Sequence, residues 1–398
     1  MTLNLPIMAA PLFQDYSCPR SSMAPFAETP ILSLYRSSPI EVSKEPDLLD
    51  GWWKSGYAWI CISHRSRFNK PGDYIAMELA GFPILIILGK DRIVRAFHNV
   101  CRHRAYTITK KPAGSSLVLG CRYHGWSYDT RGNLVKAPQF DGLDGFNKSE
   151  NSLFKIRSCT DRAGFIHINL DAGHFEHAPD CDNIVNFSIN HGISTTSTWL
   201  TGWNVDGAFN WKTAGANDRT GIGTPRVDTS KVNFMESILS LFRRPCLDLN
   251  GSQASYLAPT TAVLAFPKSP IWIMLTTAPV SPEICTVKCD MFSTTKQPLH
   301  PNDEEDLKSF LASYVQDLEE RYAALKNSKP NEEPVFLPIL KAHLRLEKSV
   351  GMDIFPGRRD DGRSASFCRA EKVCKDLDEM AKVAGLVRTD SVQGGLEW

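Results

Sequence analysis

The sequence predicts an α+β protein of two domains, in which a small all-β module is followed by an antiparallel sheet that packs on one long helix. Three observations support this prediction. The chain has 398 residues, 42% of them hydrophobic, so it exceeds one average domain and can bury a large core. Its first half contains short β-rich runs separated by Gly, Pro, Asp and Lys turns. Its second half contains further β-rich runs and then a segment with helical spacing.

The first elements define an N-terminal arm and a small β domain. Residues 1–45 are predicted to be the arm, because the stretch up to about Arg36 is rich in Pro, Ser and Ala and has no periodicity. Ordered structure is expected from Pro46. The all-β domain is predicted over 46–170, where the strand-like runs are YAWICIS, PILIILG, IVRAFHNV and GFIHINL.

The second domain is predicted over 171–398. Its β-rich stretch begins at Ser252 and contains SYLAPTTAVLAF, IWIMLTTAPV and ICTVKCDMFST, which are typical of an antiparallel meander. A helix is expected to open at Pro301 with an acidic first turn and to close at Lys329-Pro330. Its apolar positions recur at helical spacing: Leu307, Leu311, Tyr314, Leu318, Tyr322 and Leu325. Cys285 and Cys289 would share one face of a strand as core or half-buried thiols.

Charge and cysteine content exclude several classes of protein. With 45 basic and 44 acidic residues the net charge is +1, which gives no basic field for nucleic acid or an anionic membrane. The first residues lack a basic stretch followed by an apolar run, and no segment approaches a membrane span. Eleven scattered cysteines do not form a disulfide framework. The expectation is a cytoplasmic protein.

Two short motifs carry metal-binding chemistry. Cys101-Arg102-His103 is followed, after seventeen residues, by Cys121-Arg122-Tyr123-His124. Two loops that each supply one cysteine and one histidine give two thiolates to one iron and two imidazoles to the other, as a Rieske-type [2Fe-2S] cluster requires. On spacing alone, a structural zinc site is the alternative.

The residues around these motifs resemble a known family. The stretches CRHRA and CRYHGWSYD are similar to the Rieske domain of ring-hydroxylating and choline monooxygenase-type oxygenases. The resemblance extends from about Leu32 to Asn327 and is to the α-subunit of Rieske non-haem iron oxygenases, most of all the choline monooxygenase-like group. It implies that 46–170 is a Rieske [2Fe-2S] domain. It also implies that 171–398 is a catalytic-type domain with the helix-grip (START-like) fold.

The expected cofactor is therefore a [2Fe-2S] cluster held by Cys101, His103, Cys121 and His124. Two imidazoles in place of two thiolates raise its potential into the range of roughly −150 to +300 mV, so it can accept electrons from a ferredoxin-type donor. The chain has no flavin or nicotinamide fingerprint, so a separate reductase is required. Three arginines in and beside these motifs have two open interpretations. They position the loops or a carboxylate of a partner, or they belong to the solvated surface: Arg102, Arg104 and Arg122.

The second metal site that the resemblance implies is degenerate here. In the family, two histidines after an Asn-Trp-Lys segment bind a mononuclear iron together with one carboxylate, which leaves positions open for dioxygen. Here Asn210-Trp211-Lys212 is present, but Gly223 and Asp228 stand at the two histidine positions. Thr220 replaces the aspartate that links the Rieske histidine of one subunit to the iron of the next. No histidine lies between His191 and His300 to replace the pair.

The carboxylate ligand of the family falls on the predicted helix. Asp317 and Glu319 both remain candidates, and either would also be an ordinary solvated helix carboxylate. A site with Asp228 and one helix carboxylate has lost both imidazoles and would bind Fe(II) weakly. The catalytic residues are therefore unassigned, and the sequence gives no complete ligand set for mononuclear Fe(II).

Three classes of function stay open. The first is an electron-relay subunit of an oxygenase that keeps its cluster and passes electrons to an iron-competent paralogue, in the trimeric homo- or hetero-oligomer that the resemblance implies. The second is a self-sufficient monooxygenase with atypical iron ligands. The third is a non-catalytic binding or scaffold homologue. For the first two the substrate is a small organic molecule whose identity the sequence does not give.

Overall fold

The computed structural model describes residues 59–79, 82–143, 146–170, 178–215, 252–257, 260–266, 269–281, 283–296, 301–326 and 345. The predicted arm over 1–45 lies outside the described residues, and so do Thr220, Gly223 and Asp228. In the part of the chain that the structure describes, no helix is long and apolar enough to cross a membrane.

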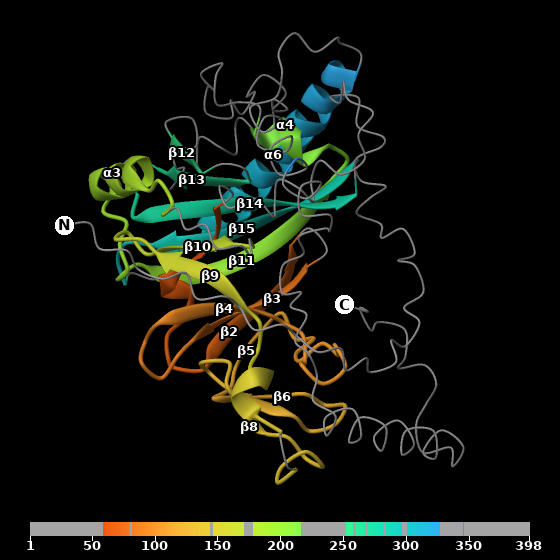
Figure 1. The fold of residues 1–398 in the computed structure, drawn as a ribbon. Helices are drawn as coiled ribbons and strands as arrows, with labels where there is room; N and C mark the ends of the chain where they lie inside the picture. Colours follow the sequence, from red (N-terminus) through yellow and green to blue (C-terminus); the bar gives the residue numbers. More distant parts are fainter. Residues whose placement is uncertain are drawn as a thin grey trace, which may run out of the picture. The chain divides into compact units, whose positions relative to one another are not determined.

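The N-terminal half consists of two antiparallel sheets (Figure 1). In spatial order the larger sheet contains β1 (Ile60–His64), β10 (Phe165–Asn169), β9 (Lys155–Thr160), β4 (Val94–His98), β3 (Phe82–Leu88), β2 (Asp73–Leu79) and β5 (Ala113–Ser115). The smaller sheet contains β6 (Val118–Gly120), β7 (Ser127–Asp129) and β8 (Leu134–Lys136). The predicted all-β module is therefore present. Its apolar run PILIILG forms most of β3, whose residues Ile84–Leu88 are fully buried.

The second domain is built on a five-stranded antiparallel sheet. Its order is β11 (Thr198–Gly207), β15 (Ile284–Ser293), β14 (Ile271–Ser281), β13 (Thr261–Ala265) and β12 (Gln253–Leu257). The predicted meander is present as β12–β15, but the run SYLAPTTAVLAF divides into β12 and β13, since a proline in the middle of the run cannot continue a ladder. The strand β11 was not predicted, because it stands at the edge of the sheet and its apolar side chains are only partly buried.

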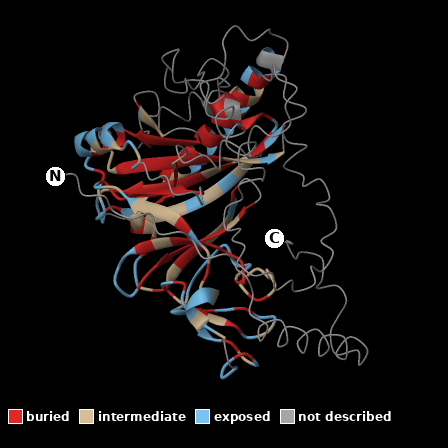
Figure 2. Cartoon of the chain, viewed as in Figure 1, coloured by how far each residue is buried: buried red, intermediate tan, exposed pale blue. Residues whose placement is uncertain are grey.

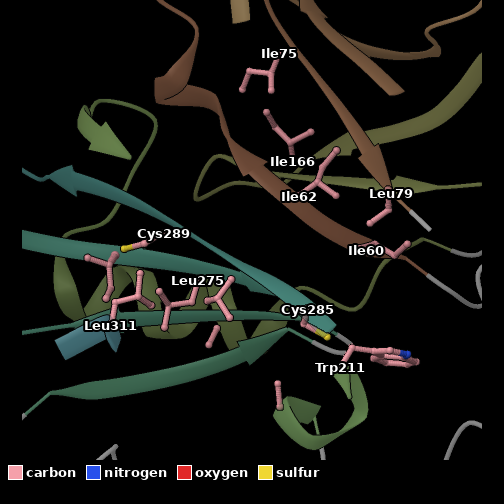
Figure 3. Packing of buried hydrophobic residues seen from close by; sticks show 14 of the residues in the cluster. Ile60, Ile62, Ile75, Leu79, Ile166, Trp211, Leu275, Cys285, Cys289 and Leu311 are labelled. Carbon is pink, nitrogen blue, oxygen red and sulfur yellow. The ribbon is translucent and has the colours of Figure 1, made fainter. Parts of the chain in front are cut away.

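One long helix covers one face of this sheet, as predicted. The helix α6 (Pro301–Lys326) packs Leu307, Leu311 and Leu318 against the sheet residues that alternate toward it. Figure 3 shows Leu311 beside Leu275, with Cys285 and Cys289 among the same buried side chains. Both cysteines are fully buried, as expected for core thiols. The fold class predicted from the sequence is thus confirmed.

The opposite face of the five-stranded sheet packs on strands β1 and β10 of the first domain and on a second helix. Val263, Trp272 and Phe292 point to this face and join a cluster with Phe165 of β10. The helix α3 (Asp182–His191) adds Ile184 to this cluster and leaves its outer side exposed (Figure 2). This helix and the short α4 (Trp211–Gly215) were not predicted. Only two residues of α3 are buried, and a helix of ten residues is too short to be recognised securely from the spacing of its apolar residues.

Polar contacts join the first domain to the five-stranded sheet of the second. The guanidinium of Arg67, in the 3-10 turn η1 (Arg65–Arg67), donates to the carboxylate of Asp290 on β15 and lies 4.2 Å above the ring of Trp199. The Trp199 indole N–H donates to the same carboxylate over 3.1 Å. Thr261 donates its hydroxyl to the carbonyl of Cys61 over 2.6 Å. The buried carboxylate thus joins a turn of the first domain to two strands of the second.

Candidate metal centre

Two loops with the same backbone geometry form the candidate site. Loop 1 (residues 101–106) is closed by the bridge between Val100 and Thr107, and loop 2 (residues 121–126) joins β6 to β7. In each loop the cysteine amide donates to the carbonyl five residues on, over 2.9 Å to Tyr106 and 2.8 Å to Trp126. In each, the carbonyl of the cysteine accepts from the amide four residues on. The local hydrogen bonds therefore fix both loops.

The turn at the end of each loop needs a left-handed residue. Ala105 has φ 53° and Gly125 has φ 74°, at equivalent places four residues after the cysteine. This conformation is free for glycine and mildly strained for alanine. It turns each loop back on itself, so that the amide of this residue reaches the carbonyl of the cysteine.

The four predicted ligand side chains meet where the loops face each other. The imidazole rings of His103 and His124 are 4.5 Å apart between centroids, at an interplanar angle of 72°. Cys101 and Cys121 are both buried reduced cysteines in this structure, and their thiols are close enough to share a hydrogen bond. The structure thus brings together two thiols and two imidazoles from loops 1 and 2.

The two thiols differ in acidity. The hydrogen bond from Cys101 and the backbone amides of Tyr123 and His124 lower the pKa of Cys121 to about 7. The same hydrogen bond, followed by burial, raises the pKa of Cys101 well above its ordinary value. Thiolates are the metal-binding form of cysteine. Cys121 therefore loses its proton more readily than Cys101, and Cys101 loses its proton when a bound cation replaces it.

The side chains behind the loops are aromatic and exclude water. Trp126 is fully buried and its ring is stacked on His103, with centroids 5.0 Å apart and an angle of 8°. Tyr128 is also fully buried. Its oxygen accepts from the Arg102 amide over 3.0 Å and lies 3.3 Å from the sulfur of Cys101, to which its O–H can donate once the thiol has lost its proton. No role for Tyr128 was predicted from the sequence, although it lies two residues after Trp126 and so shares its face of the chain.

The two histidines differ in exposure. His103 is buried, whereas His124 is half-buried beside Tyr123, which is 44% exposed. Arg102 lies with its guanidinium 3.7 Å above the ring of Phe154 and donates to the carbonyl of Glu150 over 3.2 Å. Arg102 therefore holds loop 1 against the chain that precedes β9, and His124 marks the side of the site nearest solvent.

The structure describes only part of the second predicted metal site. Gly223 and Asp228 lie outside the described residues. Of the two carboxylate candidates on α6, Asp317 is half-exposed, and Glu319 accepts a hydrogen bond from the amide of Ala208 over 2.7 Å. Glu319 thereby ties α6 to the chain that leaves β11.

Comparison with known protein families identifies the first domain. Residues 58–147 match the family described as the Rieske [2Fe-2S] domain. A domain of this family binds a [2Fe-2S] cluster, and the two thiols and two imidazoles of loops 1 and 2 are the donor set that such a cluster needs. The predicted cofactor is confirmed.

Curated relatives are oxygenase subunits. The chain is 37% identical over 114 residues to the carnitine monooxygenase oxygenase subunit of Acinetobacter baumannii, which covers 29% of this chain and 30% of the relative. It is 35% identical over 145 residues to the chlorobenzene dioxygenase subunit alpha of a Cupriavidus species, which covers 35% of this chain and 31% of the relative. The matched stretches thus span about a third of these relatives, and the resemblance to Rieske oxygenases predicted from the motifs is confirmed.

Solved structures extend the similarity in fold to the second domain. The crystal structure of the quaternary ammonium Rieske monooxygenase CntA with an inhibitor matches with a TM-score of 0.54 and 22% identity, over 68% of this chain and 80% of that one. Naphthalene 1,2-dioxygenase from a Rhodococcus species, bound to indole, matches with a TM-score of 0.55 and 16% identity, over 75% of this chain and 84% of that one. The chain shares the fold of both.

Proposed function

We propose that this Rieske-domain chain is an electron-relay subunit of an oxygenase. It would take electrons from a separate reductase or ferredoxin-type donor and pass them to an iron-bearing partner subunit, which oxygenates a small organic substrate. The observation that carries the proposal is the meeting of Cys101 and His103 of loop 1 with Cys121 and His124 of loop 2. The sequence adds that Gly223 and Asp228 stand where the resemblance implies the iron histidines.

The side chains of the site suit electron transfer. A bound [2Fe-2S] cluster would supply one-electron redox chemistry at a potential raised by its two imidazole ligands. Tyr128 donates a hydrogen bond to the Cys101 sulfur, and Trp126 fixes the plane of His103 and shields it from water. The half-buried His124 offers the shorter route to a redox partner at the surface.

The sequence of the second domain supports a partner that holds the oxygen-activating iron. Gly223 and Asp228 provide no imidazole, and Glu319 already serves as an acceptor for the Ala208 amide. In a head-to-tail ring, which only a heterologous interface can produce, the cluster of one subunit faces the iron position of the next. In a ring of identical copies, the subunit next to every cluster would have Gly223 and Asp228 in place of the two histidines that bind iron in the family.

The ligand assignment is tested with one cysteine variant and a matched control. Replacement of Cys121 by Ser should bleach the visible absorption and abolish the rhombic EPR signal of the reduced cluster. Cys285→Ser is the control, because Cys285 is equally buried but donates to the carbonyl of Phe209 over 3.2 Å, a bond that serine can also make. A Cys121→Ser protein that keeps both signals would refute the assignment.

The relay function is tested by iron content and turnover. The chain purified alone should hold about two irons per polypeptide and hydroxylate no substrate with reductase and dioxygen. Co-expression with an iron-competent paralogue should yield activity that is lost in His124→Ala. A homomer with a further, mononuclear iron and its own hydroxylase activity would favour the self-sufficient oxygenase. A cluster that no reductase reduces would favour the scaffold homologue.

A further inference from the structure

Three metal-binding side chains meet at a place remote in sequence from the cluster loops. They are Asp161 in the turn after β9, His167 on β10 and Cys181 immediately before α3, and their ligand atoms all lie within 4.8 Å of one another. The side chains of His167 and Asp161 are only 4% and 3% exposed. The established chemistry of the Rieske site uses none of these residues.

The register of the sheet explains why these donors come together. His167 lies directly opposite Cys159 on β9 and directly opposite Cys61 on β1. Residues opposite each other in an antiparallel pair project to the same face. Asp161 follows Cys159 by two residues and therefore shares that face. Two further thiols thus flank the three donors, outside the group whose ligand atoms lie within 4.8 Å of one another.

The contacts of one nitrogen atom decide between two readings of this group. A Cys-His-Asp catalytic relay needs the acid on one ring nitrogen and the thiol on the other. Here Nε2 of His167 lies 3.0 Å from Oδ2 of Asp161 and 3.6 Å from Sγ of Cys181. Both donors converge on a single nitrogen, which is the arrangement around a shared cation.

The distances match the edges of a tetrahedral zinc site. With Zn–S of about 2.3 Å and Zn–N or Zn–O of about 2.0 Å, a tetrahedron has edges of roughly 3.5 Å between S and N and roughly 3.3 Å between N and O. The observed edges are 3.6 and 3.0 Å. We propose that Asp161, His167 and Cys181 form a structural Zn²⁺ site that joins the β9–β10 hairpin to the start of α3.

The surrounding charges favour a cation. The carboxylate of Asp161, within 4.8 Å of the other two ligand atoms, supplies a negative charge that a bound cation would offset. A cysteine binds such a cation as its thiolate. The site would hold in place the chain between the two domains, and it does not depend on the proposed oxygenase function.

One substitution removes a ligand and keeps the local turn. Asp161 accepts from the amides of Gly164 and Phe165 through Oδ1, over 2.8 and 2.9 Å, while Oδ2 faces His167. Asp161→Asn can keep the Oδ1 bonds and replaces the metal-facing oxygen by an amide. Cys181→Ala removes the thiol. Asp180→Asn is the matched control, since Asp180 is an exposed neighbouring carboxylate outside the group.

The test measures zinc and iron together in the full chain with its cluster loaded. After equilibration with zinc and gel filtration, the wild type and Asp180→Asn should hold about one zinc per chain, and both ligand variants less than a fifth of that with unchanged iron. The zinc K-edge EXAFS should show sulfur at about 2.3 Å. Four outcomes would each overturn the proposal: a wild type without zinc, zinc retained in both variants, zinc lost only in Cys121→Ser, or a disulfide at Cys181 in place of zinc.

Discussion

Removing the hydroxyl of Tyr128 should lower the reduction potential of the cluster. Burial raises the pKa of Tyr128 above its ordinary value, so the phenol keeps its proton and remains a donor. Its oxygen accepts from the Arg102 amide and lies 3.3 Å from Cys101 Sγ. A thiolate ligand has no proton, so in the loaded site the Tyr128 O–H would be the donor to this sulfur. The Tyr128→Phe substitution removes this one hydrogen bond and keeps the ring in its buried position.

The magnitude follows from the charge on the sulfur. Hydrogen bonds to charged groups contribute about 1.5–3 kcal/mol, and the reduced cluster carries one more negative charge than the oxidised one. If about 1 kcal/mol of the bond is specific to the reduced form, the potential falls by roughly 40 mV, because 59 mV corresponds to about 1.4 kcal/mol for one electron. The sign is fixed: the reduced state loses more stabilisation than the oxidised state.

The assay is a redox titration followed by visible circular dichroism or protein-film voltammetry. Tyr106→Phe is the matched control, since Tyr106 belongs to loop 1 and packs 5.5 Å from the ring of Tyr123. Removal of the Tyr106 hydroxyl should leave the reduction potential of the cluster within about 10 mV of the wild-type value. A Tyr128→Phe protein with an unchanged or higher potential, and an intact EPR signal, would refute the inferred hydrogen bond to the cluster sulfur.

Three further predictions concern the free energy of unfolding. Burial lowers the pKa of His64 from 6.5 to about 4, so the unfolded chain takes up the proton at a higher pH than the folded chain. The free energy of unfolding is therefore highest above pH 6.5 and falls as the pH drops toward 4, by about 2 kcal/mol at pH 5. Arg67→Met should cost about 3 kcal/mol, because it leaves the carboxylate of Asp290, 3% exposed, with fewer partners. Gly125→Ala should cost only about 1 kcal/mol and keep the cluster, since a Cβ there would meet only Pro138, at 3.4 Å.

Urea unfolding measures all three. His64→Gln should reduce the loss of unfolding free energy between pH 8 and pH 5. The neutral imidazole donates to the Ala163 carbonyl and accepts from the Ser66 amide, and it can no longer accept once it is protonated. An equal dependence of the unfolding free energy on pH in both proteins would contradict this. For Arg67, a double-mutant cycle with Asp290→Asn should give a coupling of at least about 1 kcal/mol, and additive effects would argue against the pair. Loss of the EPR signal in Gly125→Ala would show that loop 2 tolerates no side chain there.

The cluster site could be predicted from sequence because its determinants are local. Each loop is closed by hydrogen bonds between residues four and five apart, and the motif places a cysteine and a histidine within one turn. The long helix α6 was also predictable, because its apolar residues repeat along one continuous segment. The buried strands of the meander followed from runs of apolar residues.

Only the tertiary structure decided which distant residues meet. Arg67 and Asp290 are 223 residues apart, and no local pattern pairs them. The edge strand β11 is only partly buried and the helix α3 is only ten residues long, so their packing partners determine them. The group of Asp161, His167 and Cys181 depends on the pairing of β9 with β10 and on where α3 begins. The sequence alone therefore determined the loops that hold the cluster, and sheet register and packing determined the second group of donors.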